Sequence, residues 1–440
     1  MSFFRSSHGA GALPSGRTSV LSVLDVGSSK IVCLIARLRP LRTAGGALRG
    51  RTHAIEVLGL GHQRSQGVKS GVIIDLEAAE RAIRQAVDVA ERRARVTVGS
   101  LLVGITAGRL ASETWSGSVA VSGREVSEAD VGRVLAAGRN HSTNPDRSVV
   151  HSLPIGYMLD AQSGISDPRR MVGERLGVAI HVVTADEPPL RNLELTVNRC
   201  HLSIERLVAT PYASAMAVLD EDEMDLGAVV LDLGGGTTST AIFADGQFVH
   251  ADAIALGGNH VTVDIARGLS TRIEAAERLK TIDGSALPAA DDHEMLAVPP
   301  IGGGEDGYAP TIVPHSTLTK IIRARVEETL ETARDRINKA GFASLLARRL
   351  VITGGASQLG GIADAARRVM ARNVRVGRPL GVTGLPEVAR GPAFAASVGL
   401  LVYPQIALHE QMMTPHATAS ARMTGTGYFA RVGQWFRESF

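Results

Sequence analysis

The chain has 440 residues, 44% of them hydrophobic and 4% aromatic, and its formal net charge is +3. This length predicts two or more lobes rather than one small core, and so small a charge argues against a nucleic-acid partner. The only cysteines, Cys33 and Cys200, are typical of a reducing compartment, and no apolar run reaches the length of a membrane span.

Residues 1–18 are expected to form a disordered tail, and residues 19–98 the first lobe, which segments 184–222 and 381–404 complete. VLSVLDVGSSKIVCLIARL reads as strand, small-residue turn and strand, and DLEAAERAIRQAVDVAERRA as a helix with Asp75 as its N-cap. Residues 99–183 alternate short strands with one helix, which Ser127 and Asp130 would cap. This alternation predicts an inserted α+β subdomain.

Residues 223–380 are expected to form a second lobe, whose upper part spans about 259–343. GAVVLDLGGGTTSTAIFADG repeats the order of the first lobe: apolar strand, Asp, glycine-containing turn, apolar strand. This repetition indicates an internal duplication. Residues 283–314 read as a loop, LTKIIRARVEETLETARDRINKAGF as a long amphipathic helix, and 405–426 as a flexible linker.

Three glycine-containing turns each follow an apolar strand. Their candidate ligand-binding residues are Asp25, Gly27, Ser28, Ser29 and Lys30 in the first, Asp232, Gly234, Gly235, Gly236, Thr237 and Thr238 in the second, and Gly354, Gly355 and Ala356 in the third. Such turns let backbone N–H groups approach phosphate oxygens, and the two aspartates would hold Mg²⁺ through water. One such turn alone more often reflects tight packing, but three across a duplicated chain predict an ATP cleft between lobes.

The three turns resemble the phosphate-1, phosphate-2 and adenosine motifs of the actin, hexokinase and heat-shock chaperone ATPase superfamily, the last at 352–359. More narrowly, MLDAQSGISDPRRMVGERLGVAIHVV, ALGGNHVTVDIARGLST and PAFAASVGLLVY resemble stretches of the bacterial cell-division FtsA family. The resemblance covers roughly residues 19–404 and the C-terminal tail. It implies an α/β actin-like ATPase fold of two duplicated lobes with a nucleotide cleft between them and an inserted α+β subdomain.

The same resemblance implies roles for residues outside the turns. Glu277 and Lys280 lie three residues apart on one helix, as does the superfamily pair that lies against adenosine. The helix LTKIIRARVEETL resembles the family helix near the docking site for the C-terminal tail of FtsZ, the tubulin-like ring protein. Lys320, Arg323 and Arg325 are therefore candidate contacts for that tail. The alternative for Glu277 and Lys280 is an ordinary surface ion pair, and the alternative for the cationic helix is a solvated face.

The last fourteen residues, GYFARVGQWFRESF, concentrate aromatic side chains. At about 100° per residue, a helix places the apolar residues on one side and the arginines on the other. The apolar side comprises Tyr428, Phe429, Val432, Trp435, Phe436 and Phe440. This pattern predicts an amphipathic helix at 427–440 that lies in a membrane of anionic lipids, with docking onto the protein's own core as the alternative.

The expected function is that of an ATP- and Mg²⁺-binding protein that self-assembles and tethers the FtsZ ring. It would be peripheral at the cytoplasmic face of the inner membrane, at the septum, and would recruit later division membrane proteins. ATP hydrolysis would be slow at most, and no catalytic residue is assigned. A small-molecule kinase of the same fold and an actin-like pilus-assembly adaptor stay open as alternatives.

Overall fold

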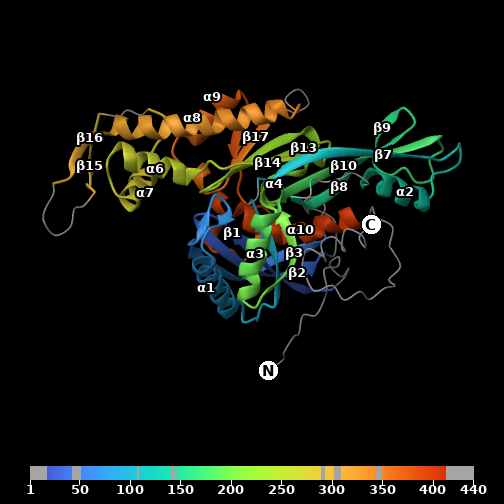
Figure 1. The fold of residues 1–440 in the computed structure, drawn as a ribbon, viewed down its shortest axis with the longest axis horizontal. Helices are drawn as coiled ribbons and strands as arrows, with labels where there is room; N and C mark the ends of the chain where they lie inside the picture. Colours follow the sequence, from blue (N-terminus) through green and yellow to red (C-terminus); the bar gives the residue numbers. More distant parts are fainter. Residues whose placement is uncertain are drawn as a thin grey trace.

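Two sheets with the same strand order form the two lobes (Figure 1). The computed structural model describes residues 17–41, 51–106, 109–139, 144, 146–288, 293–301, 309–342 and 349–412, with side chains described up to 406. In each lobe a three-stranded antiparallel meander continues into two parallel strands, so the orders β3-β2-β1-β6-β11 and β14-β13-β12-β17-β18 correspond. This correspondence confirms the predicted duplication.

The first lobe holds its sheet between helices on both faces. Its strands are β1 (Ser19–Val26), β2 (Lys30–Pro40), β3 (His53–Arg64), β6 (Ser100–Ile105), β11 (Ser203–Ala209) and the short β19 (Val382–Thr383). Its helices are α1 (Leu76–Ala94), α3 (Glu187–Arg199), α4 (Thr210–Val218) and α10 (Ala395–Met412), and a small hairpin joins β4 (Val68–Lys69) to β5 (Val72–Ile73). Asp75 caps α1 as predicted, since its carboxylate accepts from the N–H of Ala78 at 3.0 Å.

In the second lobe, α8 and α9 lie above the sheet in Figure 1, and α6 and α7 lie to its left. Its strands are β12 (Ala228–Leu233), β13 (Thr238–Ala244), β14 (Gln247–Ile254), β17 (Arg349–Thr353) and β18 (Asn373–Val376). Its helices are α5 (Glu221–Leu226), α6 (Gly258–Gly268), α7 (Ile273–Ile282), α8 (His315–Lys339) and α9 (Ile362–Met370). The expected loop at 283–314 contains a short hairpin of β15 (Met295–Val298) and β16 (Thr311–Pro314).

An inserted α+β unit extends from one end of the molecule (Figure 1). It comprises β7 (Ala111–Ala120), α2 (Glu128–Arg139), β8 (Arg147–Leu159), β9 (Gln162–Ile165) and β10 (Arg175–Asp186), with its own apolar core. Ser127 and Asp130 exchange capping hydrogen bonds at the start of α2, as predicted. The predicted boundary at 99 was wrong. Strand β6 pairs in parallel with β1 and β11 of the first lobe, so it belongs to that sheet.

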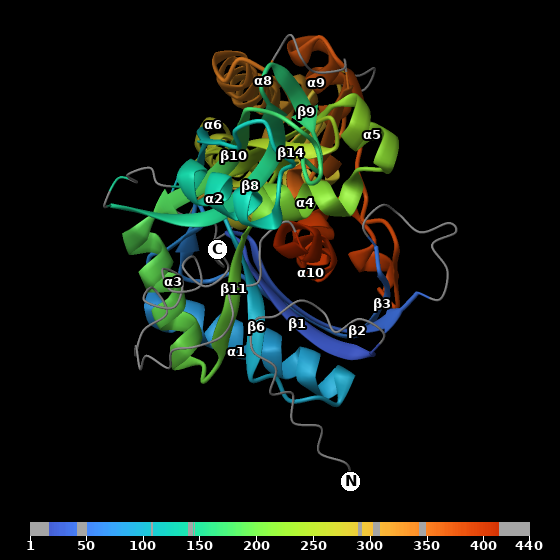
Figure 2. The same ribbon diagram turned by 90° about the vertical axis from the view of Figure 1, so that its right-hand side faces the viewer.

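Helices α4 and α10 pack against each other between the two sheets, as Figures 1 and 2 show. Every residue of α4 is buried, because α4 also contacts β12 and β13 of the second lobe. Helix α10 continues through residues 405–412, which contradicts the predicted linker start at 405. The cause is tertiary: the buried Gln405 accepts hydrogen bonds from the backbone N–H groups of Thr52 and His53, each at 2.9 Å. Segments 1–16, 42–50 and 413–440 lie outside the described residues.

Candidate functional site

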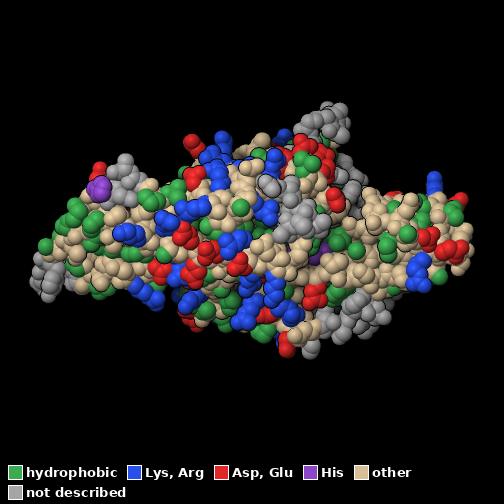
Figure 3. Space-filling model, turned by 90° about the horizontal axis from the view of Figure 1, so that it is seen from above, with side chains coloured by type: hydrophobic (Ala, Val, Ile, Leu, Met, Phe, Trp, Pro, Cys, Tyr) green, Lys and Arg blue, Asp and Glu red, His purple; other side chains and the backbone are tan. Residues whose placement is uncertain are grey.

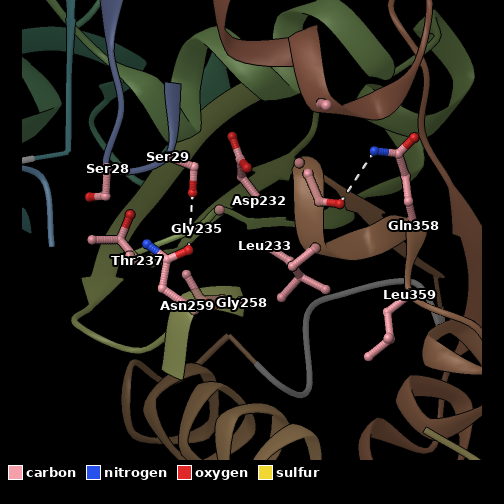
Figure 4. Close-up of a pocket in the computed structure, with 18 of the residues that line it drawn as sticks. Ser28, Ser29, Asp232, Leu233, Gly235, Thr237, Gly258, Asn259, Gln358 and Leu359 are labelled. Atoms are coloured by element: carbon pink, nitrogen blue, oxygen red, sulfur yellow. Dashed lines mark hydrogen bonds between the residues drawn. The ribbon is translucent and has the colours of Figure 1, made fainter. Parts of the chain in front are cut away.

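A cleft of about 510 Å³ lies between the lobes, and all three glycine-containing turns line it. The first turn joins β1 to β2, the second joins β12 to β13, and the third leads from β17 towards α9. Figure 4 shows side chains of the first two turns directed toward one another across the cleft. The predicted turn residues, which are far apart in the sequence, are therefore brought together.

The first two turns have the same internal geometry. Gly27 donates its N–H to the carbonyl of Lys30 at 3.0 Å, and Gly234 donates to the carbonyl of Thr237 at 2.9 Å. A Cβ atom at Gly27 or Gly234 would lie 2.8 or 2.9 Å from that same carbonyl oxygen, which is closer than real side chains approach. Glycine is therefore required at both equivalent positions.

The two turns also press against each other. A Cβ atom on Gly235 would lie 2.9 Å from the Cβ of Ser29, and one on Gly236 would lie 2.6 Å from the Cβ of Ser28. Ser29 donates its hydroxyl to Oδ1 of Asn259 at 3.1 Å, and the N–H of Asn259 donates to the carbonyl of Gly235 at 2.7 Å. Asn259 therefore bridges the two phosphate turns from the start of α6. Sequence reasoning did not assign it, although the Gly257-Gly258-Asn259 run directly after a strand is a signal.

Asp25 and Asp232 each lie one residue before the end of the equivalent strands β1 and β12. Ser397 of α10 donates to Asp25 at 2.9 Å, and Ser214 of α4 donates to Asp232. Burial raises the pKa of Asp25, and burial also raises the pKa of Asp232 to about 6, with a further increase from the charge of Asp25. Two buried acidic groups that disfavour each other's charge would be stabilised by a cation. Neither serine was assigned from the sequence.

The first turn also places a lysine in the cleft. Nζ of Lys30 donates to the carbonyl of Ala393 and lies 3.7 Å from the ring centroid of Phe394. Burial lowers the pKa of Lys30, while Asp25 and Asp232 oppose that change. Among the described residues, the hydroxyl of Thr238 is buried with no hydrogen-bond partner. The lysine, the unsatisfied hydroxyl and the glycine-containing turns fit a nucleotide phosphate chain. The paired carboxylates fit a hydrated Mg²⁺ bound to it.

The third turn closes the other side of the cleft. Gly354 has a φ of +85°, and a Cβ atom there would lie 2.6 Å from the carbonyl oxygen of Leu233. Gly355 and Ala356 line the same cleft, together with the apolar residues Val326, Leu330, Leu359 and Ile362. This apolar slot fits the flat face of a nucleobase.

The predicted adenosine-contacting pair also lines the cleft. Lys280 forms an ion pair with Glu277 at 2.6 Å, and its Nζ donates to Oγ1 of Thr262 at 2.8 Å. Thr262 belongs to α6, so the pair on α7 is anchored to the helix whose first residues donate hydrogen bonds to the second turn. No group of three or more His, Cys, Asp or Glu side chains within the described ranges is placed to bind a metal directly.

The three cationic candidates on α8 do not line this cleft. Arg325 forms ion pairs with Asp264 at 2.5 Å and Glu328 at 2.6 Å, and Arg323 pairs with Glu327 at 2.9 Å. Lys320 is exposed. Seen from above in Figure 3, basic and acidic side chains are interspersed over this part of the molecule. The charges of Arg323 and Arg325 are thus partly satisfied within the lobe.

Two family models match the chain. Residues 229–399 match "Cell division protein FtsA", and residues 107–184 match the "SHS2 domain inserted in FTSA". The cell division protein FtsA of Rhizobium meliloti (strain 1021) is 55% identical over 432 residues, which cover 97% of this chain and 96% of that protein. The chain belongs to the FtsA family of cell division proteins.

More distant FtsA proteins align along most of the chain. FtsA of Pseudomonas aeruginosa is 35% identical, and the alignment covers 86% of this chain and 88% of that protein. FtsA of Escherichia coli (strain K12) is 30% identical, and the alignment covers 95% of this chain and 97% of that protein. The cell-division role of the FtsA family therefore applies to this chain.

Solved structures confirm the actin-like fold of this FtsA-family chain. A PilM-PilN type IV pilus biogenesis complex has a TM-score of 0.58 at 16% identity, covering 88% of this chain and 98% of its own. MreB5 of Spiroplasma citri bound to AMPPNP has a TM-score of 0.51 at 11% identity, covering 89% of this chain and 98% of its own. Identities this low show the fold alone.

The membrane-binding prediction on Tyr428, Phe429, Val432, Trp435, Phe436 and Phe440 lies outside the described residues. Within the described part of this FtsA-family chain, no helix is long and apolar enough to cross a membrane.

Proposed function

We propose that this chain is an ATP-dependent assembly protein that tethers the FtsZ ring to the cytoplasmic membrane at the division site. One observation carries the nucleotide part of this proposal. Two glycine-containing turns of identical geometry, each next to a buried aspartate, meet from opposite lobes in a single cleft. The solved structure of MreB5 with AMPPNP supports a nucleotide in such a fold.

In this proposal the residues of the cleft divide the work of holding ATP. Backbone N–H groups of the two turns and the hydroxyls of Ser28, Ser29 and Thr237 bind phosphate oxygens. Lys30 adds positive charge, and Asp25 and Asp232 orient the water shell of Mg²⁺. When bound, Mg²⁺ neutralises phosphate charge. The slot beside Glu277 and Lys280 holds the adenosine.

The phosphates contact both lobes in this arrangement, so ATP favours one angle between them. That angle would set the contacts between successive copies in a filament. ATP hydrolysis would be slow at most in such an assembly protein, and no side chain is assigned as its base. Membership of the FtsA family favours this assembly role over a small-molecule kinase or a pilus adaptor, since the pilus complex shares only the fold.

The C-terminal residues 427–440 would attach the filament to anionic lipids. If each of the five aromatic side chains buries about 100 Å², the gain is about 12 kcal/mol at ~25 cal/mol per Å². Ordering the thirteen residues 428–440 as a helix costs about 1 kcal/mol per residue or more, which nearly cancels that gain. One tail would therefore bind weakly, while a filament with many tails would bind firmly by avidity.

Two surfaces would contact other division proteins. Helix α8, with Lys320 exposed and Arg323 and Arg325 partly paired, would dock the acidic tail of FtsZ. The inserted unit, which extends away from both lobes (Figure 1), would recruit later membrane proteins of the septum.

Sedimentation with vesicles that contain anionic lipid tests this proposal. The full chain is mixed with the vesicles and a peptide of the FtsZ tail, in the presence of Mg²⁺ with ATP, with ADP or with no nucleotide. We expect ATP to increase the amount of protein and peptide in the pellet. Equal pelleting in all three nucleotide conditions would contradict the assembly role.

The variant Asp232→Asn, which keeps the size of the side chain, tests the Mg²⁺ site separately. It should bind ATP equally well with and without Mg²⁺.

A further inference from the structure

One face of the first-lobe sheet is left uncovered beyond the end of α1. Helix α1 covers β3 where Gly59 and Gly61 approach the backbones of Ala90 and Ala86, and it ends at Ala94. Ile35 of β2 lies opposite Gly59, and Arg37 follows two residues later on the same face. Past this point, the described residues provide no helix over that face.

The uncovered face combines guanidinium groups with apolar side chains. Arg37 is directly opposite Val20 of β1 and Glu56 of β3. Arg39 of β2 and Leu41, the first residue after the strand, continue the alternation on the same face. Val20 and Leu41 are 44% and 38% exposed, and the side chain of Arg39 is 56% exposed. We call the surface formed by Val20, Arg37, Arg39, Leu41 and Glu56 the arginine face.

The arginine face carries more positive than negative charge. Glu56 lies 3.4 Å from Arg37 and 2.9 Å from Arg39, so one carboxylate is shared by two guanidiniums. Between Asp25 and Glu56 the sequence contains no acidic residue. Exposed apolar side chains beside a net positive charge suit the boundary between lipid headgroups and acyl chains.

The chain that carries the predicted membrane helix departs near the strand ends that carry this face, although α10 itself packs on the opposite side of the sheet from α1 (Figure 2). Gln405 of α10 accepts hydrogen bonds from Thr52 and His53, and Thr52 accepts one from the N–H of Leu41 at 3.0 Å. In Figure 1 the end of α10 and the ends of β2 and β3 lie on the same side of the first lobe. The fourteen residues 413–426 span at most about 45–50 Å, so a bound C-terminal helix keeps the end of α10 at Met412 within that distance of the membrane.

We infer, building on the proposed membrane attachment, that the arginine face is a second contact with anionic lipid headgroups. The C-terminal helix is nearly neutral in binding free energy as a single copy, so a second, electrostatic contact decides whether one molecule stays bound. Such a pair of weak signals is the usual basis of stable peripheral binding. The second contact also orients the first lobe against the membrane, which a helix on a long linker cannot do.

Sedimentation of the full chain with two vesicle types tests this inference. The vesicles are phosphatidylcholine alone and phosphatidylcholine with phosphatidylglycerol. Each guanidinium near an anionic surface strengthens binding about fivefold. The double variant Arg37→Ser/Arg39→Ser should lose about tenfold or more in affinity for the phosphatidylglycerol vesicles and nothing on the neutral ones. Glu56→Gln, which frees both guanidiniums, should gain about fivefold.

The matched control is Arg367→Ser/Arg368→Ser on α9 of the second lobe. Those arginines are similarly exposed and also pair with carboxylates, so the control removes the same charge elsewhere. Equal affinities of the two double variants for anionic vesicles would overturn the inference. Loss of binding to duplex DNA with unchanged vesicle binding would overturn it too, because the partner would then be a nucleic acid.

Deleting residues 427–440 separates failure of this inference from failure of the proposed function. If the deletion releases the chain while Arg37→Ser/Arg39→Ser behaves as the control, the tail is the lipid contact and the arginine face is not. If the deleted chain still pellets, the tail proposal fails. The arginine variant is then compared with its control within the deleted chain, where a larger loss would support the face.

Discussion

Gly235 of the second lobe packs directly against Ser29 of the first. A Cβ atom on Gly235 would lie 2.9 Å from the Cβ of Ser29 and closer still to its hydroxyl oxygen. The same hydroxyl donates to Asn259, which in turn donates its N–H to Gly235. The contacts of Ser29 with Gly235 and with Asn259 span 206 and 230 positions of sequence, and they make the two phosphate turns one structural unit.

This contact predicts that Gly235 tolerates no side chain. Gly235→Ala should lower ATP affinity about tenfold or more, because the lobes must separate to admit the methyl group, and overpacking of this kind costs about 1–3 kcal/mol. Gly235→Asp should abolish binding, since its carboxylate would also repel phosphate. Calorimetric titration with ATP measures both. Gly99→Ala is the control, because a Cβ atom there meets nothing within 4 Å. Wild-type affinity in Gly235→Asp would show that the phosphates bind elsewhere.

Stability below neutral pH should depend on His151, which lies in β8 between Tyr212 of α4 and Tyr403 of α10. Burial lowers the pKa of His151 to about 3, and its Nε2 accepts the N–H of Ala209 at 3.0 Å. Between about pH 6.5 and 3 the unfolded chain therefore binds a proton that the folded chain does not. The free energy of unfolding thus falls as the pH decreases through this range.

The variant His151→Gln removes that titration and keeps a hydrogen-bond acceptor. From pH 6.5 to 5, the wild type should lose about 1–2 kcal/mol more stability than the variant, as measured by urea unfolding at each pH. If the free energy of unfolding changed with pH in the same way for both proteins, His151 would be protonated in the folded state.

The predicted amphipathic helix at 427–440 should bind lipid through its apolar side only. Trp435→Glu places a charge on the apolar side and should release the chain from anionic vesicles, while ATP affinity stays unchanged. Gln434→Glu adds the same charge on the polar side and should retain most of the binding. Vesicle flotation compares the two. Equal flotation of both variants would argue that the residues do not bind lipid as an amphipathic helix.

Partner binding at α8 should depend most on its exposed lysine. Arg323 and Arg325 already pair with carboxylates of the second lobe, so Lys320 is the most accessible charge of the three. Lys320→Glu should weaken binding of an acidic FtsZ tail peptide about fivefold to tenfold, as measured by fluorescence anisotropy. The roughly 1 kcal/mol behind that factor is typical of an exposed ion pair. Lys339→Glu at the other end of α8 is the control, and an equal loss there would indicate only a general charge effect.

Much of the fold and of the site was predictable because it depends on neighbours in the sequence. The turn at Gly27, the cap at Asp75 and the capping pair of Ser127 and Asp130 are local arrangements that a few adjacent residues determine. The duplicated strand–Asp–turn–strand pattern was enough to predict two lobes and a shared cleft. The comparisons with known proteins then confirmed the FtsA family and the actin-like fold.

Long-range packing decided the rest, because residues far apart in sequence carry no joint signal in one chain. Strand β6 belongs to the first lobe since β1 and β11 pair with its two edges, although its apolar run suits an inserted unit equally well. Gln405 extends α10 by accepting hydrogen bonds from residues more than 350 positions away. Asn259, Ser214 and Ser397 are ordinary polar residues in the sequence, and only the folded chain brings them to the two phosphate turns and their aspartates.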